Sequence, residues 1–130
     1  MWVLDTNTLI YFFKGLGNVG DILLNHAPGD IGIPSIVLYE LEVGIAKSTS
    51  PQKRREQLKA LTTVTQLLPF NSAEAEAAAQ IRVNLEKQGT PIGPYDLLIA
   101  GTALAQNATL VTRNIREFNR IETLKMENWY

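Results

Sequence analysis

The sequence predicts an α/β domain whose central, mostly parallel sheet of four or five strands is flanked by helices. Three observations predict this class. Short apolar runs alternate with segments of helical periodicity along the chain. Residues 2–4 are apolar throughout and stop at Asp5, which is typical of a parallel strand buried on both faces. The length of 130 residues fits a single domain over residues 1–130.

The first helices follow from apolar spacing and a capping residue. Residues 8–13 have apolar side chains at helical intervals, and Asn7 is expected to cap this helix. Glycines then interrupt the chain before a short helix at 19–25. The triplet at 31–33 predicts the second short strand.

The next helices are marked by serine and proline. Ser35 is expected to cap a helix over 36–47. Pro51 stands in the first turn of another helix, which runs to about residue 66. A third strand at 67–70 is bounded by its proline.

The last third of the chain repeats the alternation. Asn71 and Glu74 have the spacing of a capping box, and the alanine-rich helix behind them ends at Gly89. Pro94 begins a further helix to about residue 106. The remaining expected elements are a β-branched strand at 109–112 and an edge strand at 123–126.

The charge balance and the residue types exclude several classes of protein. Lys plus Arg is 12 and Asp plus Glu is 13, so any nucleic-acid contact needs a local basic patch. The absence of cysteine excludes disulfides, thiolate zinc sites and a cysteine nucleophile, and it fits a cytoplasmic protein. His26 is the only histidine, which excludes a His-rich metal site. Neither a membrane-spanning run nor a signal peptide is expected.

Two aspartates stand at positions that open α/β sheets use for ligands. Asp5 follows the first strand, and ligands in such folds lie beyond the carboxyl ends of the strands. Asp96 lies in the first turn of an otherwise apolar helix. Each also has a structural interpretation: Asp5 as a cap of the next turn, and Asp96 as a partner of the helix dipole, worth about 0.3–1 kcal/mol.

Glu40 is the third candidate acid. It lies in the apolar middle of the helix over 36–47, and Glu42, two residues further, points to nearly the opposite side. Only one of them faces the sheet edge, so burial is expected for Glu40 and exposure for Glu42. Glu40 shares its face with Gly44 and Lys47, and the glycine predicts a close approach of another backbone.

The segment 112–118, just past a strand, adds further polar side chains. Thr112 and Asn114 are suited to orient water or a carboxylate, and Glu117 to provide another oxygen ligand. The alternative is a polar loop in which Arg116 and Glu117 are solvated. Three or four carboxylates without His or Cys suit a hard cation, Mg²⁺ or Mn²⁺, which offsets charge on a phosphoryl group.

Four motifs, in this order, resemble those of the PIN-domain nucleases, and above all the VapC-type toxins of bacterial toxin–antitoxin pairs. They are Leu4-Asp5-Thr6-Asn7, Glu40-Leu41-x-x-Gly44, Tyr95-Asp96-Leu97-Leu98-Ile99-Ala100, and Val111-Thr112-Arg113-Asn114 with Arg116-Glu117-Phe118. The resemblance covers essentially the whole chain. It implies a three-layer PIN-like domain with Mg²⁺- or Mn²⁺-dependent endoribonuclease activity. It also implies an RNA substrate, a cognate antitoxin and a homodimer.

The resemblance further implies metal-binding and catalytic roles for Asp5, Glu40, Asp96 and a fourth position. Many members have an Asp where Asn114 stands, and others use the Glu of an Arg-Glu-Phe run. Because Asn114 carries no charge, Glu117 is expected as the fourth acid. The matching accessory positions, which contact ligands or water, are Thr6, Asn7, Thr112 and Asn114. So acidic a site repels RNA unless cations compensate, and the best-placed cations are Lys47, Arg113 and Arg116.

Two other functions remain open from the sequence. A phosphatase of the haloacid-dehalogenase kind also begins with a strand followed by Asp, but the second Asp that it needs is replaced by Asn7. The other alternative is a catalytically silent module that binds RNA or a partner. Its only support is that the fourth acid is uncertain, because Asn114 stands where many members have an Asp. Metal-dependent cleavage of RNA distinguishes all three.

Overall fold

The computed structural model describes residues 1–130 and contains a five-stranded sheet with parallel pairing throughout. The strand order β3-β2-β1-β4-β5 makes β1 the central strand. The prediction of a mostly parallel α/β sheet is confirmed, and the last strand lies at an edge as expected. The strands are β1 (Trp2–Leu4), β2 (Ile31–Pro34), β3 (Gln66–Leu68), β4 (Thr109–Val111) and β5 (Lys125–Glu127).

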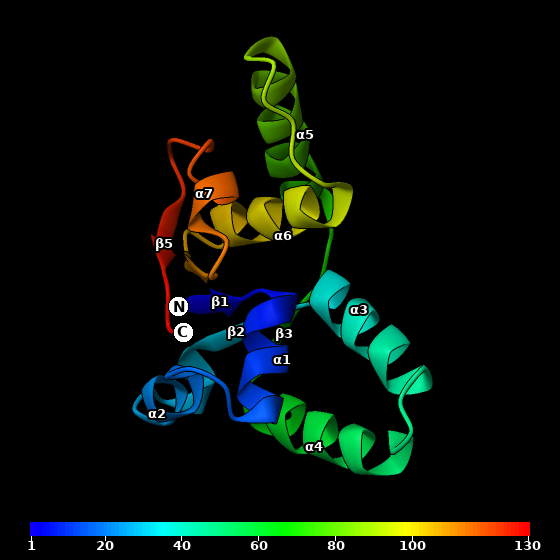
Figure 1. Cartoon of the computed structure of the whole chain (residues 1–130). Helices are drawn as coiled ribbons and strands as arrows, with labels where there is room; N and C mark the ends of the chain where they lie inside the picture. Colours follow the sequence, from blue (N-terminus) through cyan, green and yellow to red (C-terminus); the bar gives the residue numbers. More distant parts are fainter.

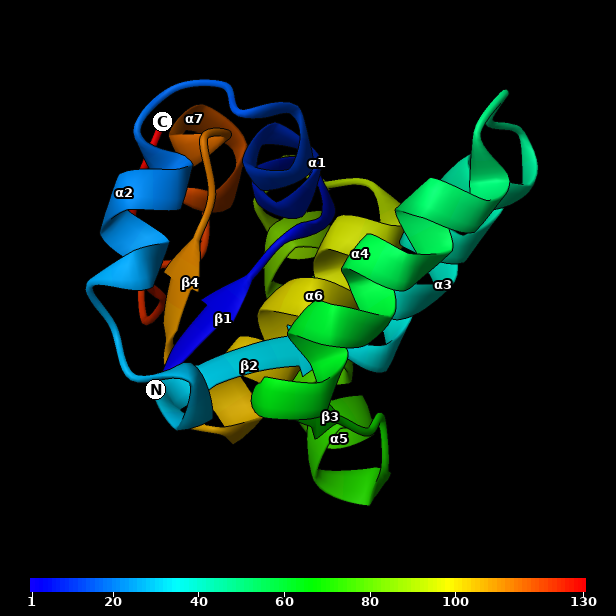
Figure 2. The same cartoon turned by 90° about the horizontal axis from the view of Figure 1, so that it is seen from below.

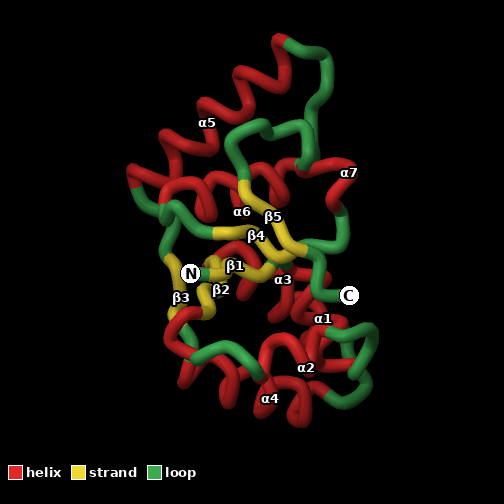
Figure 3. The backbone as a smooth tube through the Cα atoms, turned by 90° about the vertical axis from the view of Figure 1, so that its left-hand side faces the viewer, coloured by secondary structure: helices red, strands yellow, loops and turns green.

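Helices cover both faces of the sheet, which gives the three layers that the resemblance implies (Figures 1 and 3). One layer contains α1 (Thr6–Lys14), α2 (Val19–Leu24) and α4 (Pro51–Val64). The other contains α5 (Ser72–Lys87), α6 (Pro94–Ala105) and α7 (Ile115–Phe118). Helix α3 (Ser35–Ala46) contacts α1, α4 and α6, and therefore joins the two layers. Figure 2 shows α3 and α4 side by side, connected by the loop after α3.

Burial on both faces explains why the strands are so apolar. All four residues of β2 are buried, and Val3, Leu4, Leu110 and Val111 have no exposed surface. Full burial of such a side chain contributes about 1.5–3 kcal/mol. The buried apolar residues form one continuous core of 24 side chains between the layers. No helix of the structure is long and apolar enough to span a membrane.

The capping predictions are partly right. Glu74 accepts a hydrogen bond from the backbone N–H of Asn71 at 3.1 Å, so the capping box of α5 is confirmed. The prediction for Asn7 is wrong, because α1 begins two residues earlier than expected, at Thr6, and Asp5 is its N-cap. The prediction for Ser35 is also wrong, since Pro34 precedes the first helical residue and the Ser35 hydroxyl donates to the carbonyl of Leu68 at 3.0 Å.

The close backbone approach expected at Gly44 occurs at a different glycine. A Cβ on Gly44 would meet no atom within 4 Å, so this prediction is wrong. A Cβ on Gly101 would lie 2.7 Å from the Cβ of Ala78 and 2.9 Å from its backbone nitrogen. Helices α5 and α6 therefore cross at Gly101, whereas Gly44 faces open space.

Two short elements were not expected from the sequence. Residues 115–118, expected in a polar loop, form α7, and a 3₁₀ turn (Pro28–Asp30) precedes β2. A single helical turn carries too few residues for apolar periodicity to reveal it.

The third strand begins at Gln66, one residue before the expected start at residue 67, and it ends before Pro69.

Candidate active site

The site begins where the two central strands end. Leu4 of β1 pairs with Val111 of β4, so the residues that follow, Asp5 and Thr112, leave the sheet side by side. The backbone N–H of Asp5 continues the ladder by donating to the carbonyl of Val111 at 3.2 Å. From β1 the chain goes to β2 and β3 on one side, and it then crosses back to β4 and β5 on the other side of β1. The end of β1 is therefore the topological switch point, where such sheets bind ligands.

Asp5 is both the cap of α1 and the most buried acid of the site. Its Oδ1 accepts the backbone N–H of Thr8 at 2.9 Å, and the residue is only 5% exposed. Burial raises the pKa of Asp5, and hydrogen bonds from Thr112 and Thr8 act in the opposite direction. The carboxylate is therefore fixed in orientation but poorly solvated.

Glu40 and Glu42 point to different surroundings, as their spacing on a helix requires. The hydroxyl of Thr6 donates to Oε1 of Glu40 at 2.7 Å, which turns this carboxylate toward the start of α1. Glu42 instead lies 3.8 Å from Arg55, and its side chain is 45% exposed. Both residues are half-buried, so the expected contrast between a buried Glu40 and an exposed Glu42 is wrong. Glu40 is nevertheless the acid of α3 that reaches the edge of the sheet, through its hydrogen bond with Thr6.

Asp96 interacts electrostatically with the other acids of the site. It lies in the first turn of α6, where its residue is half-buried. Burial, and then the negative charges of Glu117, Asp5 and Glu40, raise the pKa of Asp96 to about 6. Four carboxylates from distant parts of the chain thus lie close enough for three of them to act electrostatically on Asp96. Together with the cavity at Asp5 they are called the acidic cleft.

Glu117 and Asn114 form a pair rather than two alternatives for the fourth position. The Asn114 side-chain amide donates to Oε2 of Glu117 at 2.8 Å, and the backbone N–H of Gly93 donates to Oε1 at 3.3 Å. Gly93 is the N-cap of α6, so Glu117 also steadies the helix that carries Asp96. Thr112 is fully buried, and its hydroxyl accepts the backbone N–H of Asn114 at 3.0 Å.

A cavity of about 230 Å³ opens at Asp5, and its lining residues are Asp5, Asn7, Tyr11, Arg113 and Asn114. Of the three cations expected to bind RNA, only Arg113 lines this cavity. Lys47 lies exposed at the C-terminus of α3, and Arg116 lies exposed on α7. Tyr11 was not expected at the site from the sequence, although its spacing of four residues from Asn7 puts both on one face of α1.

The donor set fits a hard divalent cation by its chemistry. The acids provide only oxygen ligands, and their mutual repulsion is relieved when a cation enters. No group of three or more Asp, Glu or His side chains lies close enough to surround one ion. Mg²⁺ tolerates such a site, because it usually binds one or two carboxylates and keeps several waters.

The chain as a whole has counterparts among known proteins. The model of the PIN domain family matches residues 2–124. This chain belongs to the PIN domain family. The family that the motifs predicted is therefore confirmed, and so is its fold.

Curated relatives of this PIN domain are nucleases by name. Ribonuclease VapC2 of Rickettsia felis is 37% identical over 131 residues, which cover 99% of this chain and 98% of the relative. The tRNA(fMet)-specific endonuclease VapC of Salmonella typhimurium is 35% identical and is covered to 97%, with 98% of this chain matched. The crystal structure of DNA-bound VapBC from Salmonella typhimurium is similar with a TM-score of 0.91 at 34% identity, covering 99% of this chain and 98% of that one.

The raised pKa of Asp96 predicts how stability depends on pH without metal. Between 3.8 and about 6 the folded PIN domain binds more protons than the unfolded chain, so its free energy of unfolding falls as pH rises through this window. In Asp96→Asn this fall in the free energy of unfolding is absent, because the amide does not titrate. We expect its melting temperature in EDTA to exceed that of the wild type by a few degrees at pH 7.5, with the difference closing below pH 4.

The matched control is Glu42→Gln, since Glu42 pairs with Arg55 outside the cleft. Its melting temperature should follow the wild type at every pH. A wild-type melting temperature that runs parallel to that of Asp96→Asn from pH 4 to pH 7 would contradict the shared cleft of charges.

Proposed function

We propose that this PIN domain, spanning residues 1–130, is a divalent-metal-dependent endoribonuclease that acts in the cytoplasm as the toxin of a toxin–antitoxin pair. The observation that carries the proposal is that Asp96 lies near Glu117, Asp5 and Glu40, so that burial, and then these three charges, raise its pKa to about 6. Family membership and the nuclease names of the relatives support the same activity. The name of the Salmonella relative makes tRNA(fMet) the first RNA to test.

In this proposal each acid has a stated task. Asp5 and Asp96 are the principal ligands of Mg²⁺ or Mn²⁺, Glu40 completes the shell, and Glu117 reaches the ion directly or through water. When bound, the ion offsets negative charge on the phosphodiester and makes water more acidic. Thr8 and Thr6 hold the carboxylates of Asp5 and Glu40 in place by hydrogen bonds of 2.9 and 2.7 Å.

The accessory residues support these acids. Asn114 binds Glu117, and Thr112 hydrogen-bonds Asp5 from the end of β4. Asn7 lines the same cavity as Asp5 and is exposed, so its amide is free to contact RNA or water. Prealigned carboxylates of this kind avoid reorganisation during the reaction.

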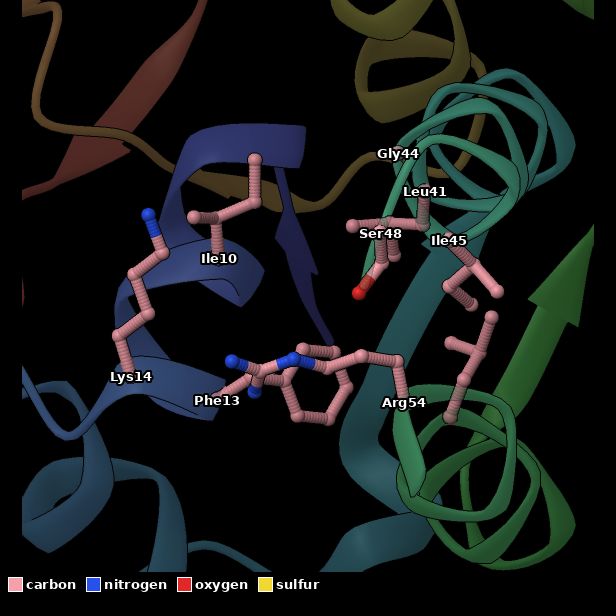
Figure 4. Close-up of a pocket in the computed structure, with 9 residues that line it drawn as sticks. Ile10, Phe13, Lys14, Leu41, Gly44, Ile45, Ser48 and Arg54 are labelled. Carbon is pink, nitrogen blue, oxygen red and sulfur yellow. The ribbon is translucent and has the colours of Figure 1, made fainter. Parts of the chain in front are cut away.

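An apolar groove on the same helices fits the antitoxin. A cavity of about 300 Å³ lies between α1, α3 and α4, and Figure 4 shows side chains of α1 facing those of α3 and α4 across it. Its walls are Ile10, Phe13, Leu41, Ile45 and Leu58, while Lys14 and Arg54 add positive charge and form no ion pair within the chain. An amphipathic segment with apolar anchors and acidic flanks matches both features.

A second copy of the chain is the other proposed partner. Tyr39 and Val43 stand four residues apart on α3 and are 51% and 37% exposed. The ring of Tyr39 contacts that of Tyr95, itself 44% exposed, with centroids 5.7 Å apart. Tyrosines and aliphatic side chains on one exposed strip are typical of an interface, which supports a homodimer.

The first prediction tests the acids. Asp5→Asn and Asp96→Asn should lower the rate of RNA cleavage in Mg²⁺ by orders of magnitude, because they remove ligand charge with little change in volume. Glu40→Gln should also lose activity, whereas Glu42→Gln should cleave at the wild-type rate. The measurement is cleavage of labelled tRNA(fMet) and total RNA, with Mg²⁺ and with EDTA.

Mg²⁺ should raise the melting temperature of the wild type more than that of Asp96→Asn, because only the wild type keeps the full ligand set. Wild-type protein that binds RNA but leaves it intact in both Mg²⁺ and Mn²⁺ would favour the silent module. Cleavage by Asp96→Asn at the wild-type rate would refute the metal-site assignment.

The second prediction tests the groove. Gly44→Leu projects a side chain into open space between α1 and α3, where a Cβ meets nothing within 4 Å. Binding of the cognate antitoxin should weaken at least about tenfold, since one lost apolar anchor costs about 1.5–3 kcal/mol. RNA cleavage without antitoxin should be unchanged. Ala46→Leu, exposed on the same helix but outside the groove, should bind the antitoxin normally.

The third prediction tests the homodimer. Light scattering should give about twice the chain's 14.4 kDa. A Tyr39→Glu/Val43→Glu double variant should give a monomer, because it places charge in the proposed interface. Val64→Glu, at a 55% exposed residue at the end of α4, serves as the control and should remain dimeric. A monomeric wild type would refute the homodimer.

A further inference from the structure

Arg113 lines the acidic cavity and yet pairs with no acid. It shares this cavity of about 230 Å³ with Asp5, Asn7 and Asn114. The ion pairs of the chain are Arg55 with Glu42 and Arg82 with Glu86, and none involves Arg113. None of its N–H groups donates to a protein acceptor either, and the residue is exposed. All five donors of this guanidinium are therefore available to a ligand.

Two aromatic rings hold Arg113 instead. Its guanidinium carbon lies 3.6 Å from the ring centroid of Tyr130 and 5.6 Å from that of Tyr11. The two rings meet edge to face, with centroids 4.8 Å apart and an interplanar angle of 73°. A cation over a ring face keeps its charge and its N–H edge, whereas a salt bridge would occupy both.

Tyr130, the last residue of the sequence, is held in place by hydrogen bonds and by close packing against Gly17. Its carbonyl accepts the backbone N–H of Asn18 at 2.7 Å and the side-chain amide of Asn18 at 3.1 Å. Its own N–H donates to Asn128 Oδ1 at 3.0 Å. Gly17 has a φ of +63°, and a Cβ there would lie 2.6 Å from the Tyr130 carbonyl and 2.8 Å from its ring. The loop between α1 and α2 thus fixes the position of Tyr130.

We propose that Arg113 binds a backbone phosphate of the RNA at the mouth of the acidic cleft, and that Tyr130 is a positioning residue that holds Arg113 there. The inference rests on the proposed ribonuclease activity and names a subsite of it. The cleft around Asp5 and Asp96 repels a polyanion, so the RNA needs a cation on its rim. An arginine whose N–H groups make no hydrogen bond within the protein is able to bind phosphate with two parallel hydrogen bonds.

An acidic side chain of a protein partner would satisfy the same guanidinium. The position of Arg113 favours RNA, because it shares a cavity with Asp5 and Asn7 rather than with the apolar groove between α1, α3 and α4. A phosphate bound beside Asp5 belongs to the chain that is being cut. Binding of the antitoxin to Arg113 is therefore an outcome that the experiment must distinguish.

The experiment measures KM and kcat for a fluorescently labelled single-stranded RNA in Mg²⁺, together with the salt dependence of KM. Arg113→Ala should raise KM by about 10- to 100-fold, the loss expected for a charge-assisted hydrogen bond, with a smaller change in kcat. The slope of log KM against log salt should become shallower by about 0.7, the value of one phosphate contact in a single strand.

Tyr130 is tested by what its variants do through Arg113. Tyr130→Leu should raise KM by about 2- to 5-fold, the value of an exposed cation–π contact. Tyr130→Phe keeps the ring and should retain the wild-type KM. Because Tyr130 acts through Arg113, the double variant Arg113→Ala/Tyr130→Leu should equal Arg113→Ala alone. A merely structural role would instead add to the effect of Arg113→Ala and would lower the melting temperature.

Three results would overturn the proposal. Arg113→Ala could leave KM and the salt slope unchanged, the double variant could show additive effects, or Arg113→Ala could weaken only antitoxin binding. Arg113 is exposed and makes no hydrogen bond, so its variant keeps the test valid even if Tyr130→Leu fails to fold. If the wild type cuts no RNA but binds the labelled RNA with an Arg113-dependent salt slope, the ribonuclease proposal fails and the phosphate subsite stands.

Discussion

The hydrogen bond between the Asp5 carboxylate and the backbone N–H of Thr8 joins the sheet to the site. It begins α1 immediately after the central strand, and the Asp5 N–H extends the pairing of β1 with β4. The same carboxylate is 5% exposed and acts electrostatically on Asp96. One side chain therefore ends a strand, starts a helix and supplies charge to the cleft. Asparagine caps helices as well as aspartate does, so charge and cap are separable at this position.

The other acids of the cleft are also held by donors rather than by cations. Thr6 holds Glu40, and Asn114 with the Gly93 N–H holds Glu117. Hydrogen bonds fix the direction of a carboxylate without neutralising it, so the negative charges remain and add to the effect of burial in raising the pKa of Asp96. The cation that lines the cavity, Arg113, is held over aromatic rings and forms no ion pair with these acids. The folded chain thus stores repulsion that an incoming divalent cation would relieve.

The acidic cleft and the apolar groove lie along the same pair of helices. Thr6 of α1 meets Glu40 of α3 at the cleft, and Ile10 and Gly44, each four residues further, line the groove. Four residues advance a helix by about one turn, so the groove continues the seam between α1 and α3 beyond the cleft. An occupant of the groove would touch the two helices that carry the Thr6–Glu40 contact. Activity and its control by a partner are therefore neighbours in this fold.

Local signals in the sequence predicted most elements and the acids. Apolar runs gave β1, β2 and β4, a proline and a capping box gave the starts of α6 and α5, and helical spacing separated Glu40 from Glu42. These signals act over about four residues, so they can be recognised without the fold. Resemblance in motif order then indicated the PIN family and the residues of the cleft.

Long-range packing decided the rest. The sequence favoured Glu117 over Asn114 as the fourth acid, and only the fold shows that the two bind each other and that Glu117 also binds the start of α6. The close approach at Gly101 depends on where α5 crosses α6, which no local pattern specifies. Arg113 and Tyr130 meet because β4 and the end of the chain converge on the loop after α1. The sequence by itself determined which residues carry charge and roughly which segments form helices, including the starts of α5 and α6, because those are local properties. Only the tertiary structure decided which charges share a cleft and which cation stays free, because these depend on contacts between residues far apart in the chain.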